Sequence, residues 1–80
     1  MEFKVVIDVE TGEVFAGLAD RNRFEDLALL LAQCQGKRDL VVSGTIVAAR
    51  DHVDAQRVAR ALPASRRSLP RRWEPTKAAV

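Results

Sequence analysis

The chain has a single cysteine, a single histidine and no tyrosine among its 80 residues. Cys34 cannot form a disulfide within the chain, so cysteine usage gives no indication of an oxidising compartment. The sequence places no nucleophile beside His52, and it has no glycine-rich loop followed by lysine that could hold a nucleotide phosphate. We therefore expect a protein that is not an enzyme and that holds no cofactor.

Long apolar runs are also missing. The longest stretch without a charged residue, Leu40 to Ala49, is too short to span a bilayer. The first residues, Met1 to Lys4, lead directly into an alternating pattern without the apolar run of a signal peptide. These absences predict a cytoplasmic protein with no membrane-spanning segment.

Carboxylates are absent between Gln56 and Glu74, a stretch that contains six arginines. Residues 1–40 contain five lysines and arginines against eight acidic residues, whereas residues 41–80 contain eight against three. The formal net charge of +2 therefore hides a steep gradient from an acidic half to a basic half. Such a gradient favours a protein that binds a negatively charged partner with its C-terminal end.

Two strands joined by a tight turn are predicted at the start of the chain. Residues 3–9 alternate, and one face carries Phe3, Val5, Ile7 and Val9. Gly12 can adopt the positive φ that a hairpin turn requires. Residues 13–19 continue as a second strand, whose matching apolar face consists of Val14, Ala16 and Leu18.

A helix is predicted to follow, between Asn22 and Gly36. Asn22 and Glu25 have the spacing of a capping box at its N-terminus, and Gly36 suits the position after its last turn. One apolar stripe has helical spacing and consists of Phe24, Leu27, Ala28, Leu30, Leu31 and Cys34. We expect this helix to cover the sheet and to bury the thiol of Cys34.

Residues 40–49 are rich in β-branched side chains and predict a third strand, with Gly44 at a bulge or at a close approach of another backbone. Asp51 can cap a second helix that ends near Leu62, before Pro63. A strand, helix, strand connection after a hairpin favours the third strand beside the first. The first helix then covers one face of the sheet. The other face is only partly apolar and must be covered by the second helix, the C-terminal residues or another chain; its apolar residues include Val6, Phe15 and Ala19.

The sequence thus predicts a small α+β domain over residues 1–62, with a three-stranded, mainly antiparallel sheet and the element order β-β-α-β-α. Residues 63–80 contain three prolines, few large apolar groups and no sustained period, which is typical of an extended arm. We call residues 63–80 the basic arm. The exposed sheet edge would also allow a homodimer.

The basic arm contains most of the residues predicted to bind a partner. Two pairs of arginines precede a tryptophan: Arg66, Arg67, Arg71, Arg72 and Trp73. Arg57 and Arg60 lie three residues apart on the second predicted helix and extend this basic surface onto the domain. Guanidinium groups bind carboxylates and phosphates, and arginine and tryptophan are frequent hot-spot residues at protein interfaces.

Three alternatives follow for the basic arm. It docks on a protein partner with an acidic surface, it contacts the phosphates of a nucleic acid with Trp73 stacked on a base, or it folds back on its own acidic domain. The domain is net acidic and has no helix-turn-helix pattern or aromatic RNA-binding strand motif, so the protein partner is favoured. The sequence therefore predicts a small regulator or inhibitor, with nucleic-acid binding as the alternative. Small domains of this layout are frequent among bacterial and mobile-element accessory proteins, an analogy of size and layout alone.

Two other polar clusters have structural explanations. Asp51, His52 and Asp54 bring an imidazole and two carboxylates together, but helix capping accounts for both aspartates. Asp8, Glu10 and Glu13 surround Gly12 without the later ligands that a calcium loop requires. We expect no metal site at either place.

Overall fold

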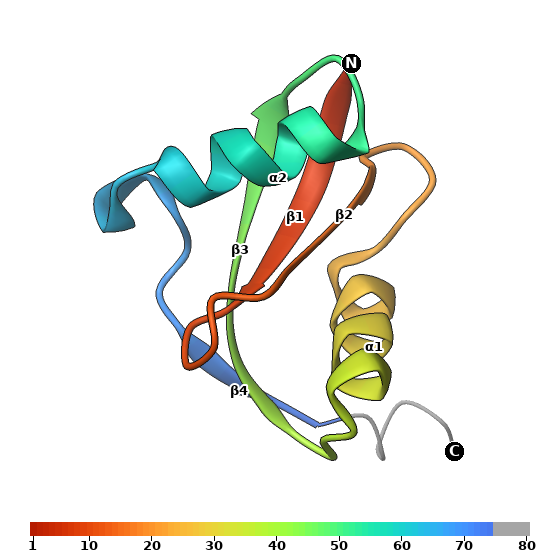
Figure 1. Cartoon of the computed structure of the whole chain (residues 1–80), viewed down its shortest axis with the longest axis vertical. Helices are drawn as coiled ribbons and strands as arrows, with labels where there is room; N and C mark the ends of the chain where they lie inside the picture. Colours follow the sequence, from red (N-terminus) through yellow and green to blue (C-terminus); the bar gives the residue numbers. More distant parts are fainter. Residues whose placement is uncertain (75–80) are drawn as a thin grey trace.

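The computed structural model describes residues 1–74 and shows four strands, two α-helices and one short 3-10 helix in this part of the chain (Figure 1). The first four elements in the chain are β1 (Glu2–Asp8), β2 (Val14–Leu18), α1 (Phe24–Gln35) and β3 (Leu40–Ala48). They are followed by α2 (His52–Ala61), the 3-10 helix η1 (Ala64–Arg66) and β4 (Arg71–Trp73). The predicted α+β class and the order of the first five elements are confirmed.

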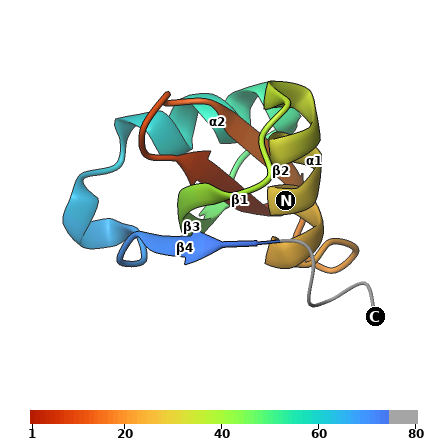
Figure 2. The same cartoon turned by 90° about the horizontal axis from the view of Figure 1, so that it is seen from below.

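The sheet is antiparallel throughout and has the strand order β2-β1-β3-β4. Phe3 pairs with Leu18, Val5 with Ala16 and Ile7 with Val14, which confirms the predicted hairpin. The prediction of three strands is wrong, because part of the basic arm adds β4 beside β3 (Figure 2). β4 could not be predicted from its own residues, because three residues are too few to show an alternating pattern. It forms by pairing with β3.

The turn between β1 and β2 is closed by backbone and side-chain hydrogen bonds. Gly12 has a φ of 80°, as the sequence predicts for the turn glycine, and its N–H donates to the carbonyl of Asp8 over 2.8 Å. The carboxylate of Asp8 accepts from the N–H groups of Glu10 (2.8 Å) and Thr11 (3.4 Å). Asp8 therefore serves the turn, and among the described residues no three histidine, cysteine or acidic side chains gather at a metal site.

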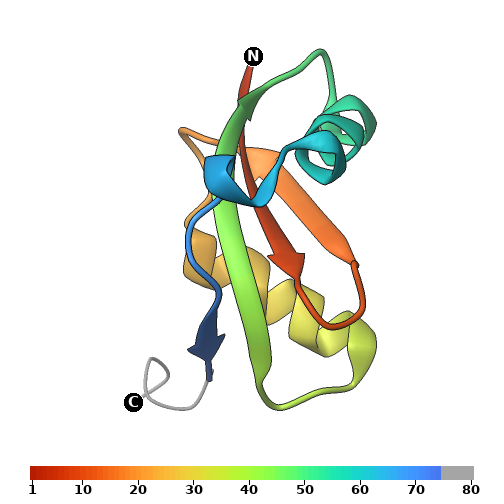
Figure 3. The same ribbon diagram turned by 90° about the vertical axis from the view of Figure 1, so that its left-hand side faces the viewer.

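The two helices cover opposite faces of the sheet (Figure 3). α2 covers the strongly apolar face, where Ala55 and Ala59 are buried in a core cluster with Phe3, Val5, Ile7, Val14 and Val47. α1 covers the sparser face, where its leucines pack in a second cluster with Val6, Leu40 and Val42. This reverses the expectation that the first helix covers the face of Phe3. The alanines of α2 let this helix pack closely on the face that carries the large side chains of β1. The leucines of α1 fill the space over the opposite face, which has fewer large side chains.

The helix ends follow the sequence in part. Asp51 caps α2 by accepting from the N–H of Asp54 over 2.8 Å, and Gly36 ends α1 in the left-handed conformation, as predicted. The predicted cap of α1 is wrong: Arg23 is the N-cap residue and makes no side-chain cap. The side-chain amide of Asn22 instead donates to the carbonyl of Leu18 over 3.0 Å.

The apolar stripe of α1 is narrower than predicted. Leu27, Ala28, Leu31 and Ala32 are buried, whereas Leu30 is 46% exposed. Cys34 is also exposed, so the prediction of a buried thiol is wrong. Leu30 and Cys34 lie at the side of the helix, outside the face that packs on the sheet, so the sheet does not cover them.

Candidate interaction site

The described part of the basic arm runs along β3 and is anchored there by Ser68. The N–H of Ser68 donates to the carbonyl of Gly44 over 2.9 Å, and the N–H of Gly44 donates to the hydroxyl of Ser68 over 2.7 Å. The hydroxyl of Ser43 donates to the carbonyl of Ser68 over 2.6 Å. Gly44 therefore marks a close approach of another backbone, one of the two roles expected for it.

Trp73 is the second anchor. It lies opposite Leu40 in the β3–β4 pairing and packs, half-buried, against the core cluster under α1. The described part of the arm thus folds back on the domain, as one of the three alternatives expects. One side of the indole is already engaged in this packing, which leaves less of it for stacking on a base.

Two of the seven predicted binding residues form ion pairs within the chain. Arg72 pairs with Asp39 and, over 3.3 Å, with Glu74; the hydrogen bond and charge of Asp39 raise the pKa of Arg72. On α2, Arg57 pairs with Asp54 over 2.7 Å. This hydrogen bond, with one from the N–H of Arg50, holds the pKa of Asp54 below its usual value. These ion pairs neutralise the charges of Arg57 and Arg72, two arginines that the sequence predicts to bind a partner.

Three other arginines are exposed and form no ion pair with a described residue: Arg60, Arg66 and Arg71. Arg67 differs from them, because its side chain is half-buried and its Nε atom is buried without a hydrogen-bond partner in residues 1–74. The predicted arginines are therefore spread over α2, η1 and β4 and have different environments.

Leu69 was not among the residues predicted to bind a partner. Its side chain is 86% exposed, the highest exposure among the large apolar residues of the described chain. It lies directly between the anchor Ser68 and Pro70, whose ring restricts the backbone of the residue before it to extended conformations. A signal was present in the sequence, since Leu69 is the one large apolar residue between the two arginine pairs.

A small pocket of about 180 Å³ lies between the arm and α1. Its walls come from Phe24, Ala28, Val42 and Trp73, and charged groups of Glu25 and Arg71 lie at it. Gly44 contributes to the space, because a Cβ there would lie 3.1 Å from the ring of Phe24. The pocket is below the usual range of about 300–1,000 Å³ for small-molecule sites.

The imidazole of His52 packs against an aromatic side chain of the core. It is exposed at the start of α2, and its ring lies edge-on to Phe3 with the ring centroids 5.0 Å apart. Its neighbours Asp51 and Asp54 are engaged in the helix cap and in ion pairs with arginines.

Within residues 1–74, no helix has the length and apolar character needed to cross a membrane. Comparison of the chain with protein-family models, with curated proteins and with solved structures gives no match.

Proposed function

We propose that this protein is a small, non-enzymatic regulator or inhibitor in the cytoplasm that docks on a protein partner with an acidic surface. The docking surface consists of the basic arm and the adjoining end of α2. Leu69 inserts into an apolar depression of the partner, and the exposed guanidinium groups of Arg66 and Arg71 pair with carboxylates around that depression.

The observation that supports this proposal most is the fixed presentation of Leu69. An exposed leucine on a mobile chain loses conformational entropy on binding, whereas Leu69 is held by the hydrogen bonds of Ser68 and by Pro70. Preorganisation of this kind strengthens binding because less freedom is lost on association. An apolar anchor surrounded by arginines also matches the composition of interface hot spots.

Nucleic-acid binding is the second candidate, and the exposed guanidinium groups of Arg60, Arg66 and Arg71 favour it. Each phosphate that they neutralise would release a counterion and make the affinity depend on salt. The ion pairs of Arg57 and Arg72 and the packing of Trp73 weaken this candidate, because they engage three of the seven predicted contacts.

Site-specific photocrosslinking in the native host tests the protein-docking proposal. A photoreactive amino acid replaces Leu69 in one variant and Val53 in a matched control, because Val53 is 76% exposed but lies on α2 away from the arm. We expect one discrete protein adduct from position 69 and none from position 53. Equal adducts from both positions, or none from either, would contradict the proposal.

Once the partner is identified, arginine substitutions separate the two candidates. Arg66→Lys and Arg71→Lys should weaken protein docking about tenfold or more, since lysine cannot replace a bidentate guanidinium. Arg50→Lys is the matched control for the same exchange, because Arg50 is exposed just before α2, at the end of that helix away from the arm. Binding of the full chain to labelled duplex and single-stranded DNA and RNA at about 50 and 200 mM salt tests the alternative. Salt-dependent binding that lysine preserves would replace protein docking by nucleic-acid binding.

A further inference from the structure

β2 forms one edge of the sheet and carries none of the usual protections of an edge strand. Its five residues, from Val14 to Leu18, include no charged residue and no proline. Natural edge strands usually discourage pairing with other chains by lysine, proline or a bulge. β4, at the opposite edge, is by contrast only three residues long and contains two arginines. The two edges of this sheet therefore differ in their capacity to accept a further strand.

The hydrogen bonds at the two ends of β2 show which of its backbone N–H and C=O groups point away from β1. Asp8 N–H donates to the carbonyl of Glu13, and Ala19 N–H donates to the carbonyl of Glu2. Hydrogen-bonded and non-hydrogen-bonded pairs alternate along an antiparallel ladder, so the backbone N–H and C=O groups of Phe15 and Gly17 also face β1. The N–H and C=O groups of the residues between them, Val14, Ala16 and Leu18, therefore point away from the sheet. The carbonyl of Leu18 is already occupied by Arg21 and Asn22.

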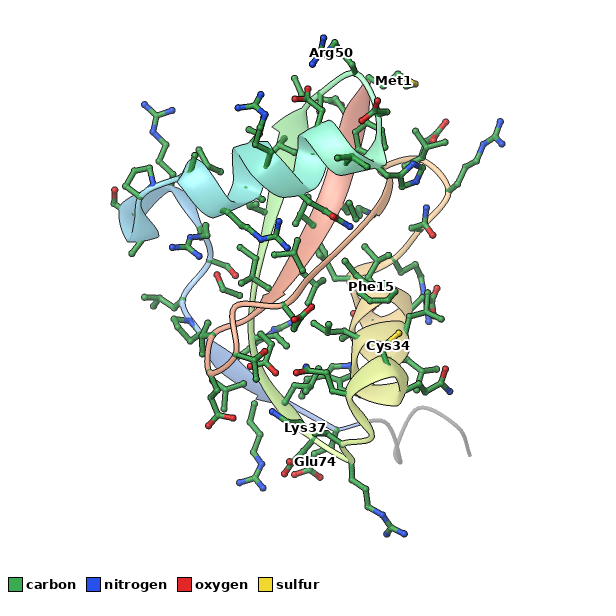
Figure 4. All side chains as sticks on the ribbon, in the orientation of Figure 1. Met1, Phe15, Cys34, Lys37, Arg50 and Glu74 are labelled. Carbon is green, nitrogen blue, oxygen red and sulfur yellow. The ribbon has the colours of Figure 1, made fainter. Side chains whose placement is uncertain are left out.

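An apolar strip on α1 lies beside this edge. Glu25 and Ala28 line the pocket on the β3–β4 side of the helix. At about 100° per residue, Leu30 and Cys34 lie on the other side, toward β2. Both are exposed. Phe15 of β2 is half-buried against the same helix (Figure 4).

Two charges at the ends of β2 are complementary. Glu13 precedes the strand, Arg21 follows it by three residues, and neither forms an ion pair with a described residue. In an antiparallel pairing of two β2 strands about Ala16, the start of each strand meets the end of the other. Glu13 of one copy then lies near Arg21 of the second copy, in two equivalent places.

We propose that β2 is a homodimer interface, in which a second copy of this chain pairs antiparallel about a two-fold axis at Ala16. Ala16 exchanges both backbone hydrogen bonds with its counterpart, and Leu18 N–H donates to the carbonyl of Val14 in the second copy. The strips of Leu30 and Cys34 pack against one another on the α1 side. The sheet becomes continuous through both copies.

This interface uses surface separate from the basic arm and goes beyond the proposed docking function. Because β4 is the edge opposite β2, each copy keeps β4 at an outer end of the joined sheet. The dimer would therefore present two docking surfaces at once, and a partner with two sites would bind it with higher avidity.

Sedimentation equilibrium of the full chain tests the proposal in reducing buffer, so that Cys34 disulfides do not contribute. The monomer has a mass of 8.9 kDa. Over about 1–500 µM protein, we expect the mean mass to rise toward twice that value. A monomer at every concentration would overturn the proposal.

Two leucines of α1 supply a matched pair of variants. Leu30→Glu places a charge in the apolar strip and should raise the dimer dissociation constant about tenfold or more. Leu29→Glu is the control, because Leu29 is 37% exposed but lies on the Glu25 side of the helix, and we expect no change. Equal effects of both variants, or no effect of Leu30→Glu, would place the interface elsewhere and overturn the proposal.

Charge reversal tests the register with residues whose side chains lie outside the core. Glu13→Arg and Arg21→Glu should each weaken the dimer, because like charges then meet across the two-fold axis. The double variant should restore the dissociation constant of the unmodified chain to within about threefold. Additive weakening in the double variant would refute pairing about Ala16, even if a dimer exists.

Discussion

The side-chain amide of Gln35 donates a 2.7 Å hydrogen bond to the carboxylate of Asp8, which is 0% exposed. This bond joins the last residue of α1 to the end of β1. Lys37 Nζ lies 3.4 Å from the same carboxylate oxygen, and the turn amides of Glu10 and Thr11 bind the other. Asp8 therefore connects the hairpin turn to the helix that covers it.

Removal of this carboxylate should destabilise the fold. Asp8→Ala leaves the turn amides and Gln35 without their acceptor, and we expect the free energy of unfolding to fall by about 2–3 kcal/mol. Glu10→Ala is the control, since Glu10 is exposed and only reaches Lys37 over 4.0 Å. Urea denaturation monitored by circular dichroism measures both. A loss for Asp8→Ala no larger than that for Glu10→Ala would contradict this role.

Asp8 should also make stability depend on pH. Burial acts to raise the pKa of Asp8, but hydrogen bonds from Gln35, Glu10 and Lys37 outweigh it and leave the pKa below its usual value. The unfolded chain, with a pKa of about 3.9, then binds the proton more readily than the folded chain. The stabilisation by the ionised carboxylate is complete above about pH 5 and is lost as the pH falls through 4 toward the folded pKa.

The comparison between the unmodified chain and Asp8→Asn isolates this effect. Between about pH 5 and pH 3, the unmodified chain should lose more unfolding free energy than the variant, whose side chain does not titrate. Asp54, whose pKa is also lowered, contributes equally to both proteins. Parallel pH profiles would show that the Asp8 pKa is the same in the folded and unfolded states.

Truncation after Pro63 should lower the melting temperature. The described arm covers part of the core cluster under α1, where Trp73 packs opposite Leu40. Exposing this apolar surface should lower the free energy of unfolding by about 1–2 kcal/mol, which corresponds to a melting temperature about 5–15 °C lower for a domain of this size. Ser68→Ala is the milder test, because it removes one anchor without removing Trp73. We expect the fluorescence of this single tryptophan to shift to the red in Ser68→Ala, and an unchanged spectrum would argue against the anchor.

The two helix starts should respond differently to alanine. Asp51→Ala removes the N-cap of α2 and should cost about 1 kcal/mol of stability. Asn22→Ala removes no cap, so its effect should come only from the lost hydrogen bond to Leu18. Helix content by circular dichroism distinguishes the two, since we expect Asp51→Ala to fray a helix and Asn22→Ala to leave helix content unchanged.

Arg67→Met should not destabilise the protein. The buried Nε of Arg67 has no partner among the described residues, so its desolvation is not offset by a hydrogen bond. Methionine keeps an apolar stem of similar length, and we expect the stability to stay within about 0.5 kcal/mol or to rise. A clear loss of stability in urea denaturation would indicate that the guanidinium makes a stabilising contact.

Alternation and the turn glycine together predict the hairpin correctly. Phe3, Val5 and Ile7 define one face of β1, and the positive φ of Gly12 fixes the turn that sets the register. The same residues do not determine which helix covers which face, because β1 is buried on both. That choice depends on the size of the alanines on α2 relative to the leucines on α1, which is a property of packing between elements.

The candidate site was predictable in composition but not in arrangement. Its arginines and Trp73 are evident from the sequence, whereas β4 depends on contacts with residues distant in the chain, namely Ser68 with Gly44 and Trp73 beside Leu40. Ion pairs such as Arg72 with Asp39 join residues far apart in the chain, so no local pattern indicates them. The exposure of Leu69 likewise follows from the path of the arm over β3.

The bond from Gly44 N–H to Ser68 has a consequence for the time scales of the molecule. Gly44 lies in the interior of β3, yet among residues 1–74 only the hydroxyl of Ser68 accepts its amide hydrogen. Detachment of the arm would expose this hydrogen to solvent while the β1–β3 bonds stay closed. Deuterium uptake at Gly44 would then measure how often the arm opens, and uptake at Val5 would measure how often the whole domain unfolds.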